Sequence, residues 1–332
     1  MRIVHAADLH VGCNRGFDHD LVRPRAAVRE LLQLVADEKP KVLVLAGDLL
    51  DHAQPTHEER AIIADLFAKC PVPIVAITGT HDRWGKEFHQ TSLNWLTPIC
   101  DKLGHRVWDR PTASEFAGAW WVALPFNAWK QTDLDLITAA LESRIPRRFS
   151  GPVIGMSHEF YRNAMTDIGF AGGEKFPFLP ISKRVDYWAL GDVHKHQRVG
   201  KNAYYSGSMY QTDFGERLPK GVLVVEIGSK PRFLPLTTPK PLVELTSVPE
   251  SWPKAFVKLS VDADKVPSPL PECVVMVNTR SKRTPIDIDV QVSEDDPLRG
   301  LATWLKQKKR FTPDMVKRAM TLARGLREQR AA

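Results

Sequence analysis

The sequence predicts an α/β protein built around a parallel β-sheet, and three observations lead to this prediction. Short apolar runs with the aliphatic and β-branched character of fully buried strands recur along the chain, as in Val42 to Ala46. Segments with helical periodicity separate the first of these runs. Each run ends abruptly in polar residues, as this one does at Gly47-Asp48. Strands that alternate with helices are typical of a parallel sheet covered by helices.

The N-terminal part predicts three strands and two helices in alternation. The first helix, Arg23 to Glu38, has a proline suited to its first turn and apolar residues at i, i+3, i+4 and i+7, so one face packs inward. The second helix follows Thr56-His57-Glu58-Glu59, which matches a capping box. The strands beside these helices are Arg2 to Ala7, Val42 to Ala46 and Val72 to Thr78. Parallel strands place their carboxyl ends at one edge of the sheet, where ligands bind in open α/β sheets.

Further strands are predicted in the middle of the chain, at Trp120 to Pro125, Val153 to Met156, Asp186 to Leu190, Ala203 to Ser208 and Val222 to Ile227. Prolines cluster from Pro235 to Pro253, so we place a domain boundary there, with one domain over residues 1–238 and a second over residues 239–332. The strands predicted in the second domain are Phe256 to Val261, Val274 to Val277 and Ile286 to Val292. Two helices close the chain, and the last begins at Thr312-Pro313-Asp314 with an N-cap, a first-turn proline and an acid.

Composition narrows the class of protein. The chain of 332 residues is 43% hydrophobic and 26% charged, which is ordinary for a globular protein. No apolar run approaches the ~18–20 residues that a membrane-spanning helix needs, and no signal peptide is evident at the N-terminus. The four cysteines are scattered and include no CxxC pair. We therefore expect neither a disulfide framework nor a zinc knuckle, but a cytoplasmic protein with free thiols.

The excess positive charge is confined to the C-terminal tail. The chain carries a net charge of +7, and residues 301–332 hold nine Lys or Arg and two Asp or Glu, so the remainder is balanced. A basic tail suits nucleic acid, an anionic surface or an acidic partner.

Acidic residues and histidines stand at the predicted strand ends, namely Asp8, His10, Asp48, His81, Asp82, His158, Asp192 and His194. Taken singly, each could serve only to cap a loop. Together, carboxylates and imidazoles are the ligand set of Mn²⁺, Fe²⁺ or Zn²⁺ rather than Ca²⁺. Because these eight residues outnumber the ligands of one ion, we predict two metals ~3.5–4 Å apart. A carboxylate and a water would bridge the two metals, and metal binding would lower the pKa of that water. Two such ions neutralise a phosphoryl group in transfer, so the predicted substrate is a phosphate ester.

The order of these motifs resembles the calcineurin-like metallophosphoesterases. The series is Asp8-x-His10, Gly47-Asp48-x-x-Asp51, Gly79-Thr80-His81-Asp82, His158 and Gly191-Asp192-x-His194. Within that family, HAADLHVG at 5–12, LGDVHKHQ at 190–197 and YSGSMYQTDFGERLPKG at 205–221 resemble the SbcD-type DNA repair nucleases. The resemblance covers about residues 1–230. It implies a four-layered α/β/β/α sandwich with a small C-terminal α+β capping domain.

The resemblance also implies roles for individual residues. The ligands of the first metal would be Asp8, His10, Asp48 and His194. The ligands of the second metal would be Asp48, Thr80, His158 and Asp192, so that Asp48 bridges the two ions. His81 would lie near the phosphate, where it stabilises the transition state or protonates the leaving oxygen, and Asp82 would orient it. Asp51 closes the Gly-Asp-x-x-Asp motif and either contributes to the site or only holds the loop.

Two positions depart from the common pattern of the family, and both concern the second metal. Thr80 stands where the family usually has Asn, and Asp192 stands where it usually has His. One account is compensation, because a carboxylate strengthens a site that a hydroxyl weakens and tilts it toward Mn²⁺ or Mg²⁺ over Zn²⁺. The other account is a crippled second site. We favour compensation, since a decaying site would more readily gain Ala or Leu than a carboxylate.

The resemblance implies a DNA exonuclease and endonuclease of the SbcD type that processes DNA ends for repair. Phosphodiester hydrolysis would use a hydroxide activated by two divalent ions, with Mn²⁺ expected, in a homodimer that works with an SbcC-like ATPase partner. One alternative is a phosphatase or phosphodiesterase acting on small phosphate esters. Another is a non-catalytic subunit that binds DNA ends as a scaffold.

Overall fold

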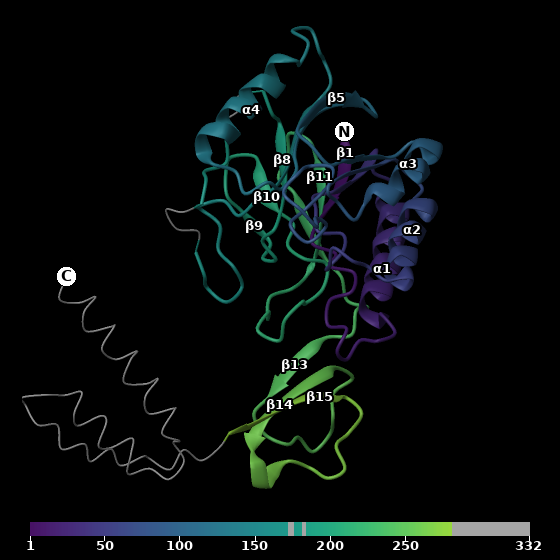
Figure 1. Cartoon of the computed structure of the whole chain (residues 1–332), viewed down its shortest axis with the longest axis vertical. Coiled ribbons are helices and arrows are strands. Elements are labelled where there is room, and N and C mark those ends of the chain that lie inside the picture. The colour runs from purple at the N-terminus through teal and green to yellow at the C-terminus, as the bar shows by residue number, and fades with distance from the viewer. Residues whose placement is uncertain (172–175, 181–183, 281–332) are drawn as a thin grey trace, which may run out of the picture. The chain divides into compact units, whose positions relative to one another are not determined.

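The computed structural model describes residues 1–171, 176–180 and 184–280. In these residues the chain forms two six-stranded sheets and one three-stranded sheet, and helices cover the outer faces of the two larger sheets (Figure 1). None of the helices in this part of the chain is both long and apolar enough to cross a membrane.

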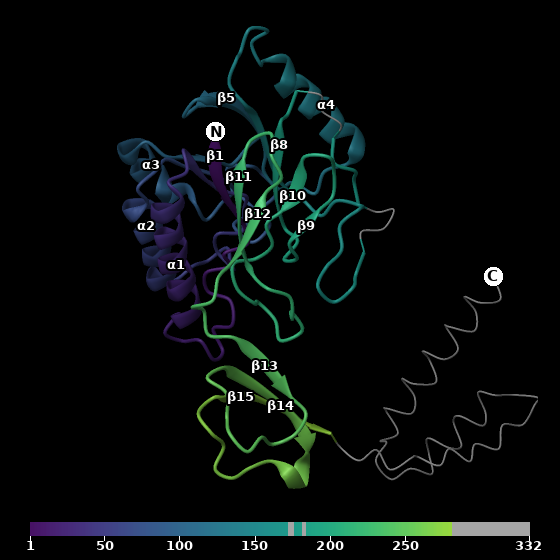
Figure 2. The same cartoon turned by 180° about the vertical axis from the view of Figure 1, so that it is seen from behind.

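The first sheet has the three predicted N-terminal strands at its centre. Its order is β12-β11-β1-β2-β3-β4, and Figure 2 shows β11 and β12 from behind. Strands β1 to β4 are parallel, β11 is antiparallel to β1, and β12 is antiparallel to β11. The bounds are β1 (Arg2–Ala6), β2 (Val42–Leu45), β3 (Ile74–Ile77), β4 (Arg106–Trp108), β11 (Gly221–Glu226) and β12 (Arg232–Pro235). The carboxyl ends of β1, β2 and β3 therefore meet at one edge, as predicted.

The second sheet has the order β5-β6-β7-β8-β10-β9. Its four inner strands are parallel, and the edge strands β5 and β9 are antiparallel to their neighbours. The bounds are β5 (Thr112–Phe116), β6 (Ala119–Leu124), β7 (Val153–His158), β8 (Tyr187–Gly191), β9 (Gln197–Arg198) and β10 (Ala203–Tyr205). The carboxyl ends of β7 and β8 carry the other predicted site residues.

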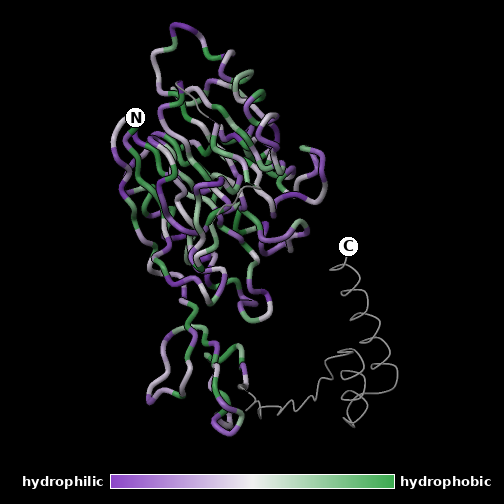
Figure 3. Tube along the Cα trace, turned by 90° about the vertical axis from the view of Figure 1, so that its left-hand side faces the viewer, coloured by the Kyte–Doolittle hydropathy of each residue, from purple (hydrophilic) through white to green (hydrophobic). Residues whose placement is uncertain are grey.

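The two sheets pack face to face between two helical layers, which confirms the predicted α/β/β/α sandwich. Side chains from both sheets, such as Ile3 and Val75 from the first and Trp121 and Met156 from the second, form one buried cluster. Helices α1 (Val22–Glu38), α2 (His57–Lys69) and α3 (Thr97–Leu103) cover the first sheet, and α4 (Gln131–Ser143) covers the second. In Figure 3 hydrophobic stretches run mainly through the interior, where the strands lie.

Local sequence explains which elements were predicted and which were not. Helix α2 begins with the predicted capping box, in which Thr56 and Glu59 bond each other's backbone amides. Helix α4 has no side-chain cap at its first turn. Helix α3 has a proline in its first turn but only seven residues, which is too short for a long apolar stripe. Two short 3₁₀ helices, Asn94–Leu96 and Ala263–Lys265, complete the set in the described residues.

A small parallel sheet follows the sandwich in the chain. It consists of β13 (Leu242–Leu245), β14 (Phe256–Asp262) and β15 (Val274–Arg280). A cluster that includes Phe17, Phe214 and Phe256 joins it to residues of the sandwich, and residues up to Arg280 form one compact unit. The boundary at residue 238 and the α+β capping domain stay predictions. The predicted strand Ile286 to Val292 and the two closing helices lie outside the described residues.

Candidate metal centre

Four of the predicted metal ligands have an unusual backbone conformation. Asp8, His10, Asp48 and Asp192 have φ angles of 53°, 42°, 49° and 92°, in the left-handed region that residues other than glycine rarely adopt. Such conformations cost roughly 1–3 kcal/mol each and cluster at functional sites. Here the surroundings hold them, because the amide of Asp8 donates to the carbonyl of Gly47 and that of His10 to the carbonyl of Asp48.

The glycines of two motifs allow the strand ends to approach one another. A Cβ atom added to Gly47 would lie 2.2 Å from Nδ1 of His158, and one added to Gly79 would lie 2.2 Å from Oδ1 of Asp48. Both distances are far shorter than any real contact of a Cβ atom. Glycine is thus required before Asp48 and before Thr80 because candidate ligands pack directly on its backbone.

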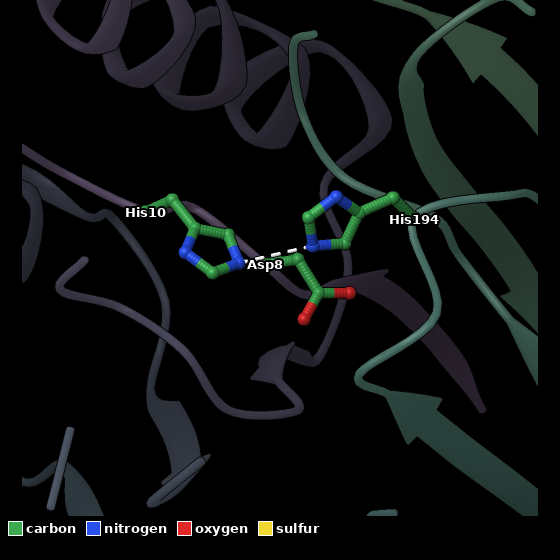
Figure 4. A group of neighbouring side chains, drawn as sticks. All are labelled: Asp8, His10 and His194. Carbon is green, nitrogen blue, oxygen red and sulfur yellow. Dashed lines mark hydrogen bonds between the residues drawn. The ribbon is translucent and has the colours of Figure 1, made fainter. Parts of the chain in front are cut away.

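One group of candidate ligands consists of Asp8, His10 and His194 (Figure 4). The Nε2 atoms of the two histidines are 3.0 Å apart. Their other ring nitrogens are held by carboxylates, since Nδ1 of His10 donates to Asp51 at 2.9 Å and Nδ1 of His194 donates to Glu216 at 2.7 Å. A carboxylate only accepts, so both Nδ1 atoms carry hydrogen, and Nε2 is the atom left to bind a metal.

A second group lies around His158. Its Nδ1 donates to the carbonyl of Ala46 at 2.7 Å, which again leaves Nε2 as the ligand atom. This Nε2 is 3.2 Å from Oδ2 of Asp48 and 3.7 Å from Oδ1 of Asp192. The same Oδ2 of Asp48 is 3.6 Å from Nε2 of His10 in the first group. Asp48 therefore lies between the two groups.

The buried carboxylates favour positive charge in this centre. Burial alone would lower the pKa of His158, but the carboxylates of Asp48, Asp8 and Asp192 raise that pKa well above its ordinary value. Burial alone would raise the pKa of Asp48, but His158 and His10 hold it well below its ordinary range. Burial and the neighbouring carboxylates raise the pKa of Asp192 to about 6. The carboxylates therefore stabilise positive charge among them, either as a proton on His158 or as a bound cation.

Two further buried atoms support metal binding. Oδ2 of Asp8 and the hydroxyl of Thr80 have no hydrogen-bond partner among the residues that the structure describes. Buried polar atoms are normally paired, so an unpaired carboxylate oxygen on Asp8, which lies in the same candidate ligand groups as His10, His194 and His158, indicates a position for an ion or water. The residues present therefore fit divalent metals. Asp8 lies close enough to His10 and His194 to hold an ion with them, and also close enough to Asp48 and His158.

The structure differs from the prediction that Asp82 orients His81. The buried carboxylate of Asp82 instead accepts hydrogen bonds from the backbone amides of Leu49, Leu50 and Gly79, which joins the two loops behind the site. The exposed ring of His81 donates through Nδ1 to the backbone carbonyl of Asp51 at 2.9 Å. A buried carboxylate satisfies the amides that surround it, and those amides are close only in the folded chain.

Asp51 contributes to the site and does not only hold its loop. One carboxylate oxygen accepts from His10, the other lies 3.1 Å from Nε2 of His52, and the backbone carbonyl accepts from His81. One residue thus orients a candidate metal ligand and the candidate catalytic histidine together.

Glu216 and Lys220 were not predicted as site residues, although both lie in the motif at 205–221. Hydrogen bonding from His194, with the charge of Lys220, overcomes the effect of burial and lowers the pKa of Glu216 to about 2. Nζ of Lys220 is 3.1 Å from Glu216 and donates to the backbone carbonyl of His194 at 2.9 Å. No spacing rule links a carboxylate at 216 to an imidazole at 194, so the sequence held no signal for this contact.

Comparisons with known proteins indicate the family to which the chain is similar. The family model described as Calcineurin-like phosphoesterase matches residues 1–196. The chain is 25% identical over 272 residues to a Staphylococcus epidermidis protein named as a subunit of the nuclease SbcCD, which covers 74% of this chain and 71% of that protein. It is 25% identical over 293 residues to the corresponding SbcCD protein of Rhodobacter capsulatus, covering 74% and 71%. It is also 26% identical over 256 residues to the uncharacterized metallophosphoesterase YhaO of Bacillus subtilis, covering 68% and 57%.

Proposed function

This chain belongs to the calcineurin-like phosphoesterases, hydrolases of phosphoester bonds, and we propose that it is a metal-dependent DNA nuclease that processes DNA ends. The observation that carries the proposal is the position of Asp48. One oxygen of its carboxylate lies 3.6 Å from Nε2 of His10 and 3.2 Å from Nε2 of His158, so this carboxylate is within reach of two groups of candidate ligands. A shared carboxylate suits a pair of metals, and metal pairs suit phosphodiester hydrolysis.

The proposed roles divide between metal ligands and His81. The first metal would be held by Asp8, His10, Asp48 and His194, and the second by Asp48, Thr80, His158 and Asp192. When bound, two divalent ions lower the pKa of a water and neutralise the phosphoryl group. Mn²⁺ suits this mixture of carboxylates and imidazoles.

His81 is the proposed catalytic residue outside the metal shell. Its Nδ1 donates to the backbone carbonyl of Asp51, which leaves Nε2 to face the substrate. In the protonated imidazolium, Nε2 also carries a hydrogen and can donate it to a phosphate oxygen or pass it to the leaving oxygen. Its ring lies against His10, with centroids 4.7 Å apart, which places it at the edge of the first group. The backbone amide of His81 donates to Asp48 at 2.8 Å, so the bridging residue also holds the loop of His81.

Relatives support DNA as the substrate. Two of the relatives above are named as subunits of the nuclease SbcCD, and the chain aligns with about seven tenths of each. We therefore propose DNA ends as the substrate, a homodimer as the assembly and an SbcC-like ATPase as the partner. The basic tail, which lies outside the described residues, is the segment with the charge to contact DNA.

A nuclease assay tests this function directly. The protein, freed of metal and supplied with Mn²⁺, is incubated with end-labelled duplex and single-stranded DNA and with methyl p-nitrophenyl phosphate. We expect shortening of labelled DNA that depends on Mn²⁺. Hydrolysis of the small diester without cleavage of either DNA would favour a small-molecule phosphodiesterase. Binding of DNA ends without any hydrolysis would favour the scaffold function.

Replacement of Asp192 by Ala tests the second metal site. If Asp192 compensates for Thr80, the Asp192→Ala protein should bind one Mn²⁺ in place of two, and turnover of a phosphodiester should fall about 100-fold, the effect expected for losing several kcal/mol of charge stabilisation. Calorimetric titration with Mn²⁺ measures the stoichiometry. Asp65→Ala, on the exposed side of α2, serves as a control for loss of a carboxylate elsewhere. An unchanged stoichiometry in Asp192→Ala would reject compensation. One ion in both proteins would favour a crippled second site, whereas two ions in both would show that the second site forms without Asp192.

A further inference from the structure

A short hairpin follows β7 in the connection to β8, over residues 165–171. Met165 and Ala171 pair as an antiparallel bridge, and the amide of Thr166 donates to the carbonyl of Phe170 at 2.8 Å. The turn closes with the amide of Gly169, which donates to the carbonyl of Thr166 at 3.1 Å. A positive φ of 85° at Gly169 suits this tight turn.

Buried polar contacts hold this hairpin beside the candidate metal centre. The carboxylate of Asp167 points inward and lies 2.7 Å from Nζ of Lys220, and the two side chains are only 3% and 5% exposed. The same Nζ donates to the backbone carbonyl of His194 at 2.9 Å. Gln197 adds two hydrogen bonds to the backbone of Met165, at 3.0 and 2.7 Å. One lysine therefore connects the hairpin to a candidate metal ligand.

The outward side of the hairpin is apolar. Met165, Ile168 and Phe170 are 43%, 75% and 54% exposed. The ring of Phe170 is supported from behind by Phe160 and Phe176, with ring centroids 5.8 and 6.2 Å away. Contacts on one side restrict an exposed aromatic ring before any ligand arrives, and such restriction lowers the entropy cost of stacking.

We propose that this hairpin tip binds an unpaired nucleobase next to the scissile phosphate, an inference that rests on the proposed nuclease function. In a nucleic acid strand, the groups nearest the reacting phosphate are its sugars and bases. Apolar side chains cannot bind phosphate, but they can stack on a base. Bases inside a duplex are covered on both faces, so the tip selects single strands and frayed ends.

Abasic substrates test the proposal. The substrates are a series of single-stranded oligonucleotides, each with one nucleoside replaced by a tetrahydrofuran residue. The replaced position varies over the three nucleotides on either side of the cleavage site. For the wild-type protein with Mn²⁺, we expect kcat/KM to fall about 5- to 100-fold when the contacted base is missing, the range of base–aromatic stacking. The substitutions Phe170→Ala and Ile168→Ser should each reduce kcat/KM for the complete oligonucleotide by a similar factor. For these variants, removal of the contacted base should cause no further decrease in kcat/KM.

The variants have matched controls. Phe170→Trp retains a stacking ring and should keep the wild-type sensitivity. Ile168→Ser removes only an exposed side chain, so it tests the tip even if Phe170→Ala loosens the hairpin. Leu103→Ala shortens another exposed apolar residue, on helix α3, and should behave as wild type. All four proteins should hydrolyse methyl p-nitrophenyl phosphate at the wild-type rate, because that diester carries no nucleobase.

The outcomes separate this proposal from the nuclease function. If the wild-type protein cleaves DNA but both tip variants remain as sensitive to base removal as wild type, the hairpin proposal is overturned and the nuclease function stands. A tip that binds a partner protein in place of a nucleobase would give the same result, and the hairpin proposal would then also be overturned. If the wild-type protein cleaves no DNA, both proposals are overturned.

Discussion

Asp48→Asn should abolish binding of both metals and reduce hydrolysis of a phosphodiester by about 10³-fold or more, equivalent to several kcal/mol of transition-state stabilisation. The reason is that Oδ2 of Asp48 faces both groups of ligands, at 3.6 Å from His10 and 3.2 Å from His158. An amide lacks the charge needed to hold two cations. Metal content is measured by mass spectrometry after dialysis against Mn²⁺, and activity with methyl p-nitrophenyl phosphate.

The Asn variant is chosen because it can preserve the fold. Its side-chain oxygen can still accept the hydrogen bond that Asp48 receives from the amide of His81 at 2.8 Å. The thermal unfolding temperature of the metal-free protein should therefore stay close to that of the wild type. Asp65→Asn on α2 provides the matched control. Retention of two metal ions in Asp48→Asn would show that Asp48 is not the bridge.

His81→Ala should lower kcat by about 10²- to 10⁴-fold, the usual contribution of a positioned acid or base, while two metals remain bound. Metal binding should survive because the imidazole is exposed and held by the carbonyl of Asp51, and the proposed ligands of both metals remain in place. The measurement pairs calorimetric titration of Mn²⁺ with steady-state kinetics on end-labelled DNA. His57→Ala, at the exposed start of α2, controls for loss of an imidazole.

Two results would contradict this role of His81. A His81→Ala protein with wild-type kcat would exclude catalysis by this residue. Loss of one metal would instead make it a ligand, since Asp48, His10 and His81 lie close enough together to hold an ion. Substrates with a good leaving group separate the two roles that remain. A proton donor to the leaving oxygen becomes dispensable with p-nitrophenolate, whereas a residue that stabilises the phosphoryl charge does not.

The strands were predictable because each is a short apolar run buried on both faces. The predicted Val42 to Ala46 corresponds to β2 (Val42–Leu45), and Trp120 to Pro125 corresponds to β6 (Ala119–Leu124). Edge strand β5 (Thr112–Phe116) is half exposed and mixes polar with apolar residues, so it lacks that signal. Helix α4 was missed because it has no side-chain cap and buries only a few side chains against the sheet.

The contacts around the ligands were not predictable in the same way. Asp82 follows His81 in the chain, yet its carboxylate bonds amides of Leu49, Leu50 and Gly79. The partner of His194 is Glu216, across a loop and two strands. Such hydrogen bonds depend on how the loops after different strands meet in the folded chain, and no local sequence pattern predicts this.

By itself, the sequence determined the α/β class, the alternation of strands and helices in the N-terminal part and the set of residues at the carboxyl ends of the strands. These follow from burial and from polar residues placed after apolar runs, which are local properties of the chain. Only the tertiary structure decided which ring nitrogen each histidine presents, that Asp48 lies between two ligand groups, and that Lys220 joins a hairpin to His194. The physical reason is that hydrogen bonds and charge act over a few ångströms, between groups that only folding brings together.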